Sequence, residues 1–242
     1  MPKFSHAIVV GASSGIGREI VRQLAATGTM VAALSRRAPD LEALAKEFPG
    51  FVLPYCHDVN DFDSVPQLFQ DITTDLGGLD LFVYSSGAML KVEPEEFDFV
   101  KDRQMIEVNV LGAMAWLNLA ATRFGSAGHG SIVAIGSVAG DRGRAGQPAY
   151  NTSKAALATY MEALRNRLSK KGVKVVTIKP GPVATPMIAG LGFKDPMPVE
   201  VAARKIIAKA DKTGEHYLKL THHAMFFVIR HIPSLIFRRM KL

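Results

Sequence analysis

The segment Tyr150–Lys154 places a phenol and an ammonium group four residues apart. If the segment is helical, the two side chains lie on the same face of the helix. A neighbouring cation favours the phenolate, so we expect Lys154 to lower the pKa of Tyr150 and make it a proton donor and acceptor near neutral pH. Ser137 follows an apolar run and offers a hydroxyl to a substrate carbonyl. Taken alone, a tyrosine and a lysine at this spacing are usually a surface pair.

A glycine-rich segment, Val10–Arg18, follows the first apolar run of the chain. In it, Gly11 permits a tight turn, Gly15 lets the backbone approach a phosphate, and Gly17 permits close packing of a helix on a strand. A helix that begins here directs unpaired N–H groups and the positive end of its dipole at a pyrophosphate. The alternative is a plain glycine-rich turn between a strand and a helix.

The second apolar run ends at Ser35-Arg36-Arg37. An NAD site usually has an acidic residue at this point, about 20 residues past the glycines, to accept hydrogen bonds from the ribose. A carboxylate would repel the 2′-phosphate of NADP, whereas a guanidinium can pair with it. The sequence therefore predicts that NADP(H) is preferred over NAD(H). The alternative is that both arginines merely cover the solvated start of a helix.

Short apolar runs alternate with segments of helical length along the chain. Both faces of such apolar strands must be buried, as in a parallel sheet covered by helices, and ligands bind at the carboxyl ends of its strands. We therefore predict an α/β fold with a doubly wound, Rossmann-type parallel sheet in a single domain spanning residues 1–242. The expected strands are Ala7–Val10, Met30–Leu34, Phe51–Cys56, Leu79–Tyr84, Ser131–Ile135 and Val173–Ile178. The expected helices are Gly17–Ala26, Asp40–Glu47, Ser64–Leu76, Asp102–Phe124 and Tyr150–Lys171.

The net charge of +7 is concentrated near the carboxyl end of the chain. Residues 216–242 contain no acidic residue and carry five of the seven excess charges. Because the rest is nearly balanced, a broad nucleic-acid surface is not expected. No apolar run reaches the roughly 18–20 residues of a membrane span, and no signal peptide is recognisable. With Cys56 as its single cysteine, the chain is expected to be cytoplasmic.

Metal and hydrolase sites are not expected. Cys56, His57 and Asp58 are adjacent, so on a strand they point to opposite faces and cannot share a metal. The pair His222-His223 has no matching cysteine or carboxylate nearby, and none of the seven histidines pairs with a serine in a hydrolase motif.

Together these motifs resemble the short-chain dehydrogenase/reductase family, from Ala7 to about Met187. The glycine spacing is that of the family, and the match continues through Asp58-Val59, Asn109, Ser137, the Tyr150–Lys154 segment and Pro180-Gly181 with Thr185. The resemblance implies an oxidoreductase that interconverts a carbonyl and a secondary alcohol, with the hydride supplied by the nicotinamide cofactor. An epimerase or dehydratase on the same fold, or a nucleotide-sensing binding protein, are the alternatives.

The resemblance also implies site residues. Tyr150 would exchange the proton, Lys154 would hold the nicotinamide ribose, Ser137 would orient the carbonyl, and Asn109 would hold a water of the proton relay. Asp58 would bind the adenine amine. The expected cofactor-binding residues are Gly11, Ser13, Ser14, Gly15, Ile16, Gly17, Ser35, Arg36, Asp58, Val59, Ser86, Gly87, Tyr150, Lys154, Pro180, Gly181, Val183 and Thr185.

The chain departs from the family pattern at two places. The usual threonine before the first glycine is Val10, and the usual Asn-Asn-Ala-Gly reads Tyr-Ser-Ser-Gly at 84–87. This departure, the 140–144 run and the ending 229–233 are similar to a bacterial subgroup that includes decaprenylphosphoryl-keto-pentose reductases. Asp141, Arg142 and Arg144 of that run would either meet a phosphate or sugar or form ion pairs that brace the loop.

Three further expectations concern segments outside the motifs. Residues 188–200 resemble the family's mobile substrate lid. The two longest helices carry apolar residues beyond the needs of one sheet face, Met114, Trp116, Leu117 and Met161, and the family pairs these helices in a homodimer or homotetramer. Residues 222–242 form a basic amphipathic extension, divided by Pro233, that would pack on a partner subunit or over the substrate cleft, or contact an anionic inner membrane face. The latter would suit a lipid-linked rather than a small-molecule carbonyl substrate.

Overall fold

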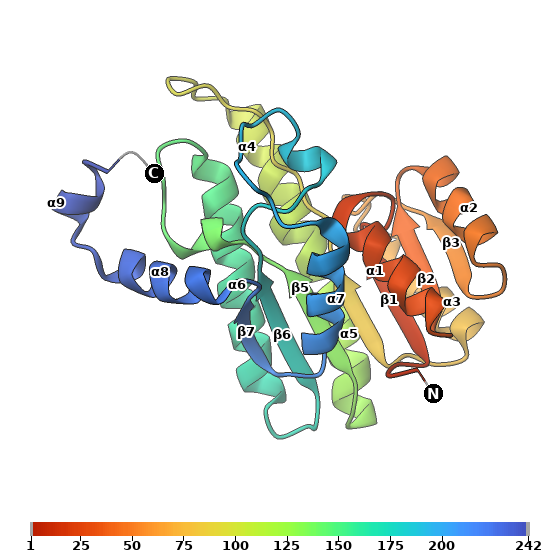
Figure 1. The fold of residues 1–242 in the computed structure, drawn as a ribbon. Helices are drawn as coiled ribbons and strands as arrows, with labels where there is room; N and C mark the ends of the chain where they lie inside the picture. The colour runs from red at the N-terminus through yellow and green to blue at the C-terminus, as the bar shows by residue number, and fades with distance from the viewer. Residues whose placement is uncertain (1, 241–242) are drawn as a thin grey trace.

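The computed structural model describes residues 2–240, so Met1, Lys241 and Leu242 lie outside the described part. A seven-stranded, entirely parallel sheet with the order β3-β2-β1-β4-β5-β6-β7 forms its centre (Figure 1). The order reverses between β1 and β4, which confirms the predicted doubly wound, Rossmann-type fold in a single domain. The strands are β1 His6–Val10, β2 Met30–Ser35, β3 Val52–Cys56, β4 Leu81–Tyr84, β5 Ser131–Ile135, β6 Lys174–Lys179 and β7 Gly214–Tyr217.

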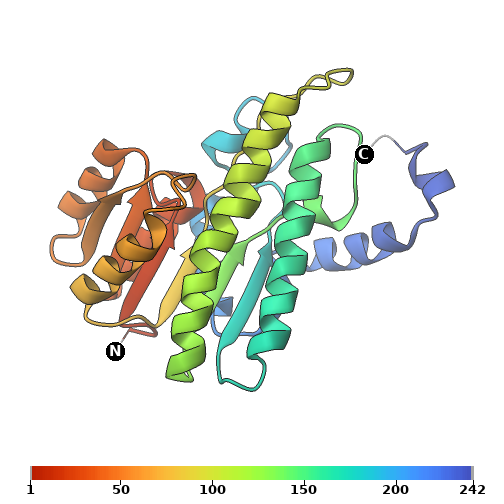
Figure 2. The same ribbon diagram turned by 180° about the vertical axis from the view of Figure 1, so that it is seen from behind.

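Helices cover both faces of the sheet, which is why its strands read as apolar runs (Figures 1 and 2). In β1, Ala7 and Val9 pack with α1, α2 and α7, whereas Ile8 and Val10 pack with α3, α5 and α6. The helices are α1 Gly15–Ala26, α2 Ala38–Glu47, α3 Val65–Leu76, α4 Phe99–Ile106, α5 Gly112–Ala127, α6 Pro148–Leu168, α7 Val199–Lys209, α8 Leu220–His231 and α9 Ser234–Phe237. Single turns are η1 Glu107–Leu111, η2 Val138–Asp141 and η3 Pro186–Ile188.

Two elements in the C-terminal part of the chain, β7 and α7, were not predicted from the sequence. Strand β7, Gly214–Tyr217, is an edge strand that pairs with β6 alone. Its residues are half-buried, so it shows no apolar run. Helix α7 begins at Val199, so the last two residues of the predicted lid, 199 and 200, belong to a helix rather than to a mobile loop.

The predicted helix Asp102–Phe124 is longer and less regular than expected. It runs without a break from Phe99 to Ala127, with a π-helical turn at Glu107–Leu111 in its middle. This stretch is apolar enough to span a membrane by length and composition, although no continuous apolar run is present. Half of its most apolar window is buried inside the protein, as in a core helix.

Three of the four apolar residues that suggested subunit contacts belong to the core, whereas Met114 is half-buried. Trp116, Leu117 and Met161 are completely buried between α5, α6 and the sheet, and Trp116 stacks on Phe82 of β4 at 6.2 Å between ring centroids. The assignment of these three residues to an interface was therefore wrong, because one face of this wide sheet needs them.

The C-terminal extension projects from the body of the protein as α8 and α9 (Figure 1). Pro233 lies between the two helices, as predicted. Within the described residues, Phe226 is the one buried residue of α8, whereas Met225, Phe227 and Val228 are exposed. This half of the extension therefore does not close over the substrate cleft of its own subunit.

Candidate active site

A cavity of about 670 Å³ opens at the carboxyl ends of β1, β2, β4, β5 and β6. Its wall contains the glycine-rich turn, the arginines after β2, the loop after β4, the start of α6 and the segment after β6. Apolar pockets with a few convergent polar groups at this edge of an α/β sheet are typical ligand sites. All the predicted site residues line this cavity except Gly17, Asp58 and Asn109.

The glycine-rich turn is packed too closely for side chains. Gly11 has a φ of +90°, and a Cβ there would overlap the backbone of Ser86. A Cβ on Gly17 would overlap the carbonyl oxygen of Gly11. Gly17 therefore lies behind the cavity and holds α1 against the turn, so that Gly15 and Ile16 at the start of α1 form part of the wall. The positive end of the helix dipole thus meets the cavity.

Both arginines after β2 line the cavity, and each has a different partner. The Arg37 guanidinium donates to Ser13 Oγ of the glycine-rich turn, at 2.9 and 3.2 Å. Arg36 lies 3.6 Å from the carboxylate of Asp58. The sequence prediction names Arg36 alone as a cofactor-binding residue, whereas Arg37 of the same Ser-Arg-Arg segment also lines the cavity.

Asn109 lies behind the cavity wall, completely buried in the π-helical turn. Its Oδ1 accepts from the N–H of Ala88 at 2.7 Å, and its Nδ2 donates to Ala88 O and Ser153 Oγ, both at 2.9 Å. The side chain thus ties the loop after β4 to α6. Both of its N–H donors are used, so this amide has no proton left for a water, and the predicted water relay stays a prediction.

The other three predicted catalytic side chains meet in the cavity wall. Ser137 caps the η2 turn, where its Oγ accepts from the N–H of Ala139 at 3.0 Å. Tyr150 and Lys154 lie one turn apart on α6 and are buried. The ammonium of Lys154 is 5.8 Å from the centre of the Tyr150 ring and donates to the carbonyl of Ile135 at 3.0 Å.

Burial governs the protonation of this pair. It raises the pKa of Tyr150, while the Ser137 hydroxyl and the charge of Arg144 act in the opposite direction. The expected lowering of the Tyr150 pKa by Lys154 is therefore wrong for the structure described. Burial also lowers the pKa of Lys154, to about 8, because the buried ammonium has lost its hydration.

The Asp141–Arg144 run divides between two roles. Arg144 lines the cavity, whereas Asp141 and Arg142 contact the C-terminal segment. For these two residues the structure supports the bracing alternative. An apolar part of the cavity wall comes from the segment after β6, with Met187, Ile188, Leu191 and Phe193.

Comparison with known proteins identifies the family. A family model described as short chain dehydrogenase matches residues 5–194, most of the chain. The chain belongs to the short-chain dehydrogenase family. As a member, it is a dehydrogenase or reductase that acts on CH–OH or carbonyl groups and uses a nicotinamide cofactor.

Two curated relatives and one solved structure illustrate the similarity. An uncharacterized oxidoreductase of Myxococcus xanthus is 38% identical over 198 residues, covering 81% of this chain and 78% of the relative. A cis-4-hydroxycyclohexanecarboxylate dehydrogenase of Sinomonas cyclohexanicum is 31% identical, covering 92% and 91%. A short-chain dehydrogenase of Burkholderia cenocepacia, solved in complex with NADP, shares the fold with a TM-score of 0.84 at 21% identity, covering 98% of both chains.

The lowered pKa of Lys154 predicts a pH-dependent stability. An unfolded lysine keeps its proton up to its ordinary value of 10.5, whereas the folded one releases it near 8. Between these values the unfolded chain binds more protons, so stability rises with pH, by up to roughly 3 kcal/mol. In Lys154→Met this gain is absent. Without added nucleotide, the unfolding free energy of the parent should therefore rise relative to the variant between about pH 7 and about pH 10.

Urea unfolding at both pH values measures this difference. The control is Lys170→Met, which removes an exposed lysine just beyond α6 and should show no such change. A pH-independent difference between Lys154→Met and the parent would contradict the lowered pKa.

Proposed function

We propose that this protein is an NADP(H)-dependent oxidoreductase that interconverts a carbonyl and a secondary alcohol, with Tyr150 as the general acid and base. The observation that carries the proposal is the meeting of Ser137, Tyr150 and Lys154 in the wall of one cavity that also contains the glycine-rich turn and two arginines.

The cavity fits a dinucleotide. Gly15 has a φ of +53°, and a Cβ there would lie 3.1 Å from the Thr185 side chain, so only glycine leaves this part of the wall open to a phosphate. Arg36 and Arg37, with no acidic residue at Ser35, suit a 2′-phosphate. Bound in this cavity, NADPH supplies the hydride to the carbonyl carbon. The residues that would hold it are the predicted cofactor-binding residues that line the cavity, with Arg37 added, whereas Gly17 and Asp58 do not line it.

The protein's own groups move and position the proton. A raised pKa keeps Tyr150 protonated at neutral pH, which suits donation of its proton to a carbonyl oxygen. Since Ser137 Oγ accepts from Ala139, its own O–H can donate to the same oxygen. Lys154 would bind the nicotinamide ribose.

The wall chemistry supports a substrate class. The side chains of Met187, Leu191 and Phe193 offer an apolar surface, and Arg144 places a cation in the same cavity. We infer an apolar carbonyl compound that carries an anionic group. A lid at residues 188–198, shortened by the two residues that belong to α7, is part of this proposal. Its base is closed by the bridge between Val183 and Met197. Membership in the keto-sugar reductase subgroup, with a lipid-linked substrate, stays a prediction.

Replacing Tyr150 by phenylalanine tests the proton transfer. The change removes the hydroxyl and preserves the shape, so turnover should fall by about 10²–10⁴-fold while NADPH binding persists. Turnover is followed by NADPH absorbance with a ketone panel that includes 4-oxocyclohexanecarboxylate. The control is Tyr160→Phe on the same helix, whose hydroxyl donates to Asn118 at 2.6 Å, and it should keep its turnover. Near-normal turnover of Tyr150→Phe would exclude the mechanism.

Cofactor choice is tested by Arg36→Asp. The parent should bind NADPH more tightly than NADH, by tenfold or more, because a hydrogen bond to a charged group contributes about 1.5–3 kcal/mol. The aspartate should abolish this difference, which fluorescence titration measures. Arg167→Asp makes the same charge change in the last turn of α6 and should leave the preference intact. Equal affinities in the parent would refute the proposal.

Assembly into a homodimer or homotetramer also stays a prediction, and light scattering at micromolar concentration tests it. With Trp116 and Met161 in the core, the outward face of α4 to α6 must make the contact. Leu111 on that face is 43% exposed, so Leu111→Asp should shift the mass towards the monomer. Phe51→Asp, at a position 41% exposed beside β3, should not. A monomeric parent would rule the assembly out.

Contact of residues 222–242 with an anionic membrane surface is a prediction as well. Lys241 and Leu242 lie outside the described residues. Arg230 is paired with Asp141, so Arg238 and Arg239 are the arginines of the described extension outside that pairing.

A further inference from the structure

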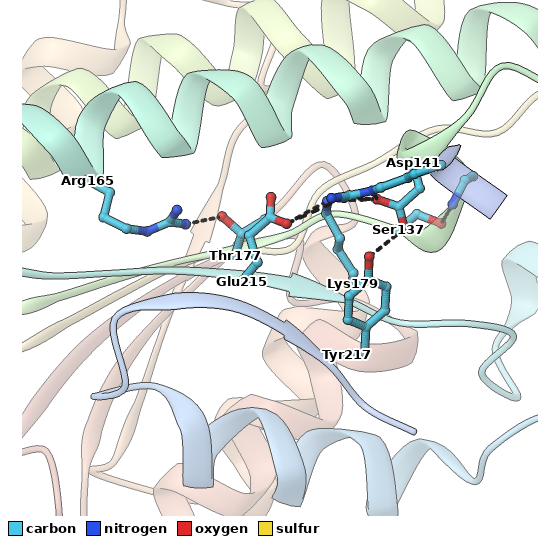
Figure 3. A network of polar contacts seen from close by, with 9 residues as sticks. Ser137, Asp141, Arg165, Thr177, Lys179, Glu215 and Tyr217 are labelled. Carbon is cyan, nitrogen blue, oxygen red and sulfur yellow. Dashed lines mark hydrogen bonds and ion pairs between the residues drawn. The ribbon is translucent and has the colours of Figure 1, made fainter. Parts of the chain in front are cut away.

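The buried carboxylate of Asp141 lies four residues beyond Ser137, at the end of the η2 turn that Ser137 caps (Figure 3). The side chain of Asp141 has no exposed surface, and it accepts from three different elements. Lys179 of β6 donates to Oδ1 at 2.9 Å, Tyr217 of β7 donates to Oδ2 at 2.8 Å, and Arg230 of α8 donates through Nε at 3.0 Å. A residue in a loop after β5 is thus fixed by the last two strands and the C-terminal helix.

The charges of this cluster balance. Glu215 of β7 accepts from Lys179 at 2.8 Å and lies 3.5 Å from Arg230, so two carboxylates face two cations. Loss of one partner of a buried pair leaves an uncompensated charge, which is far more disruptive than the loss of a surface pair. The cluster therefore holds its four elements in one arrangement.

The next residue, Arg142, binds backbone carbonyl groups at the end of the same helix, α8. Its guanidinium donates to the carbonyls of Ile229 and Ile232, at 2.9 and 2.6 Å, and stacks on Phe237 of α9 at 4.3 Å. The last carbonyls of a helix have no partner within it, and a cation there is favoured by the dipole. Asp141 therefore binds the side chain of Arg230 on α8, and Arg142 binds the C-terminal end of the same helix.

The η2 turn, which α8 contacts on one side, also packs against elements of the active site. A Cβ on Gly140 would lie 2.6 Å from the backbone of Lys154, so η2 packs directly on α6. The N–H of Val138 donates to Pro180 O at 3.1 Å. At the other end of α8, His222 lies against Gly181, where a Cβ would overlap its ring. Helix α8 thus contacts both loops that form this wall of the cavity.

We propose that Asp141, Arg142 and Arg230 form a latch through which α8 positions the Ser137 hydroxyl for the reaction. They are positioning residues, because they act through the Ser137 turn. The inference rests on the proposed function and extends it to a helix outside residues 5–194, the segment that the family model matches. The latch fixes the turn relative to Tyr150 and so orients the substrate carbonyl.

The test compares Arg230→Met with a matched control. Arg230 is 40% exposed and faces Asp141 and Glu215. Arg22 on α1 is 43% exposed and likewise faces two carboxylates, Glu19 and Glu47. With NADPH and 4-oxocyclohexanecarboxylate, Arg230→Met should lower kcat about tenfold with the NADPH dissociation constant within about twofold of the parent. Arg22→Met should keep its kcat, and Arg230→Lys should recover part of the loss.

Two further measurements separate positioning from stability. In a Ser137→Ala background, Arg230→Met should lower kcat little further, because the hydroxyl that the latch positions is already absent. Without any substrate, hydrogen exchange should accelerate in residues 138–140 of Arg230→Met and not of Arg22→Met, although position 230 is about 90 residues away in sequence.

Each outcome decides between the alternatives. Unchanged exchange in the turn, or equal kcat in the two arginine variants, overturns the latch, as does full additivity with Ser137→Ala. If Ser137→Ala and Tyr150→Phe keep their activity, the proposed function fails instead. If Ser137→Ala and Tyr150→Phe lose activity but Arg230→Met keeps it, only the latch proposal is wrong.

Discussion

A backbone contact too close for any side chain joins the two halves of the sheet at the point where the strand order reverses. Gly11 after β1 lies against Ser86 after β4, and Gly17 of α1 lies against the carbonyl of Gly11. Two residues further along the same loop, Ala88 is tied by Asn109 to Ser153 on α6. The nucleotide end of the cavity and the helix that carries Tyr150 and Lys154 are therefore parts of one packed unit. A shift of either glycine would be transmitted to the catalytic helix.

Two buried lysines, Lys154 of α6 and Lys179 of β6, are stabilised in different ways. The Lys154 ammonium has no carboxylate partner among its hydrogen bonds, and burial lowers its pKa to about 8. Lys179, just as buried, is held between Asp141 and Glu215. An unpaired buried cation is costly for stability but suited to a ligand such as a ribose hydroxyl, and strongly perturbed pKa values cluster at functional sites. A paired one serves to fix elements relative to each other.

The fold was predictable because burial on both faces leaves a local signature, the apolar run, in every interior strand. Edge strand β7 lacks this signature and was missed. Most residues that line the candidate active site were predictable because each lies in a short motif. The raised pKa of Tyr150 was not, because it depends on burial by the whole site. The partners of Asp141 were not either, since Lys179, Tyr217 and Arg230 are 38, 76 and 89 residues away. From local sequence alone, a charged run such as residues 140–144 looks the same whether it lies in an exposed loop or in a buried charge cluster.

The two ends of the cavity are built by different kinds of contact. At the nucleotide end the contacts are backbone on backbone, and any side chain added at Gly11 or Gly17 collides with them. At the substrate end the contacts are made by side chains, those of Asp141 and Arg142 towards α8 and those of the apolar residues after β6. Substitutions at the second end can therefore reshape the wall without moving the cofactor site. Such a division lets one scaffold keep its hydride chemistry while the C-terminal third of the chain changes the carbonyl compound that it accepts.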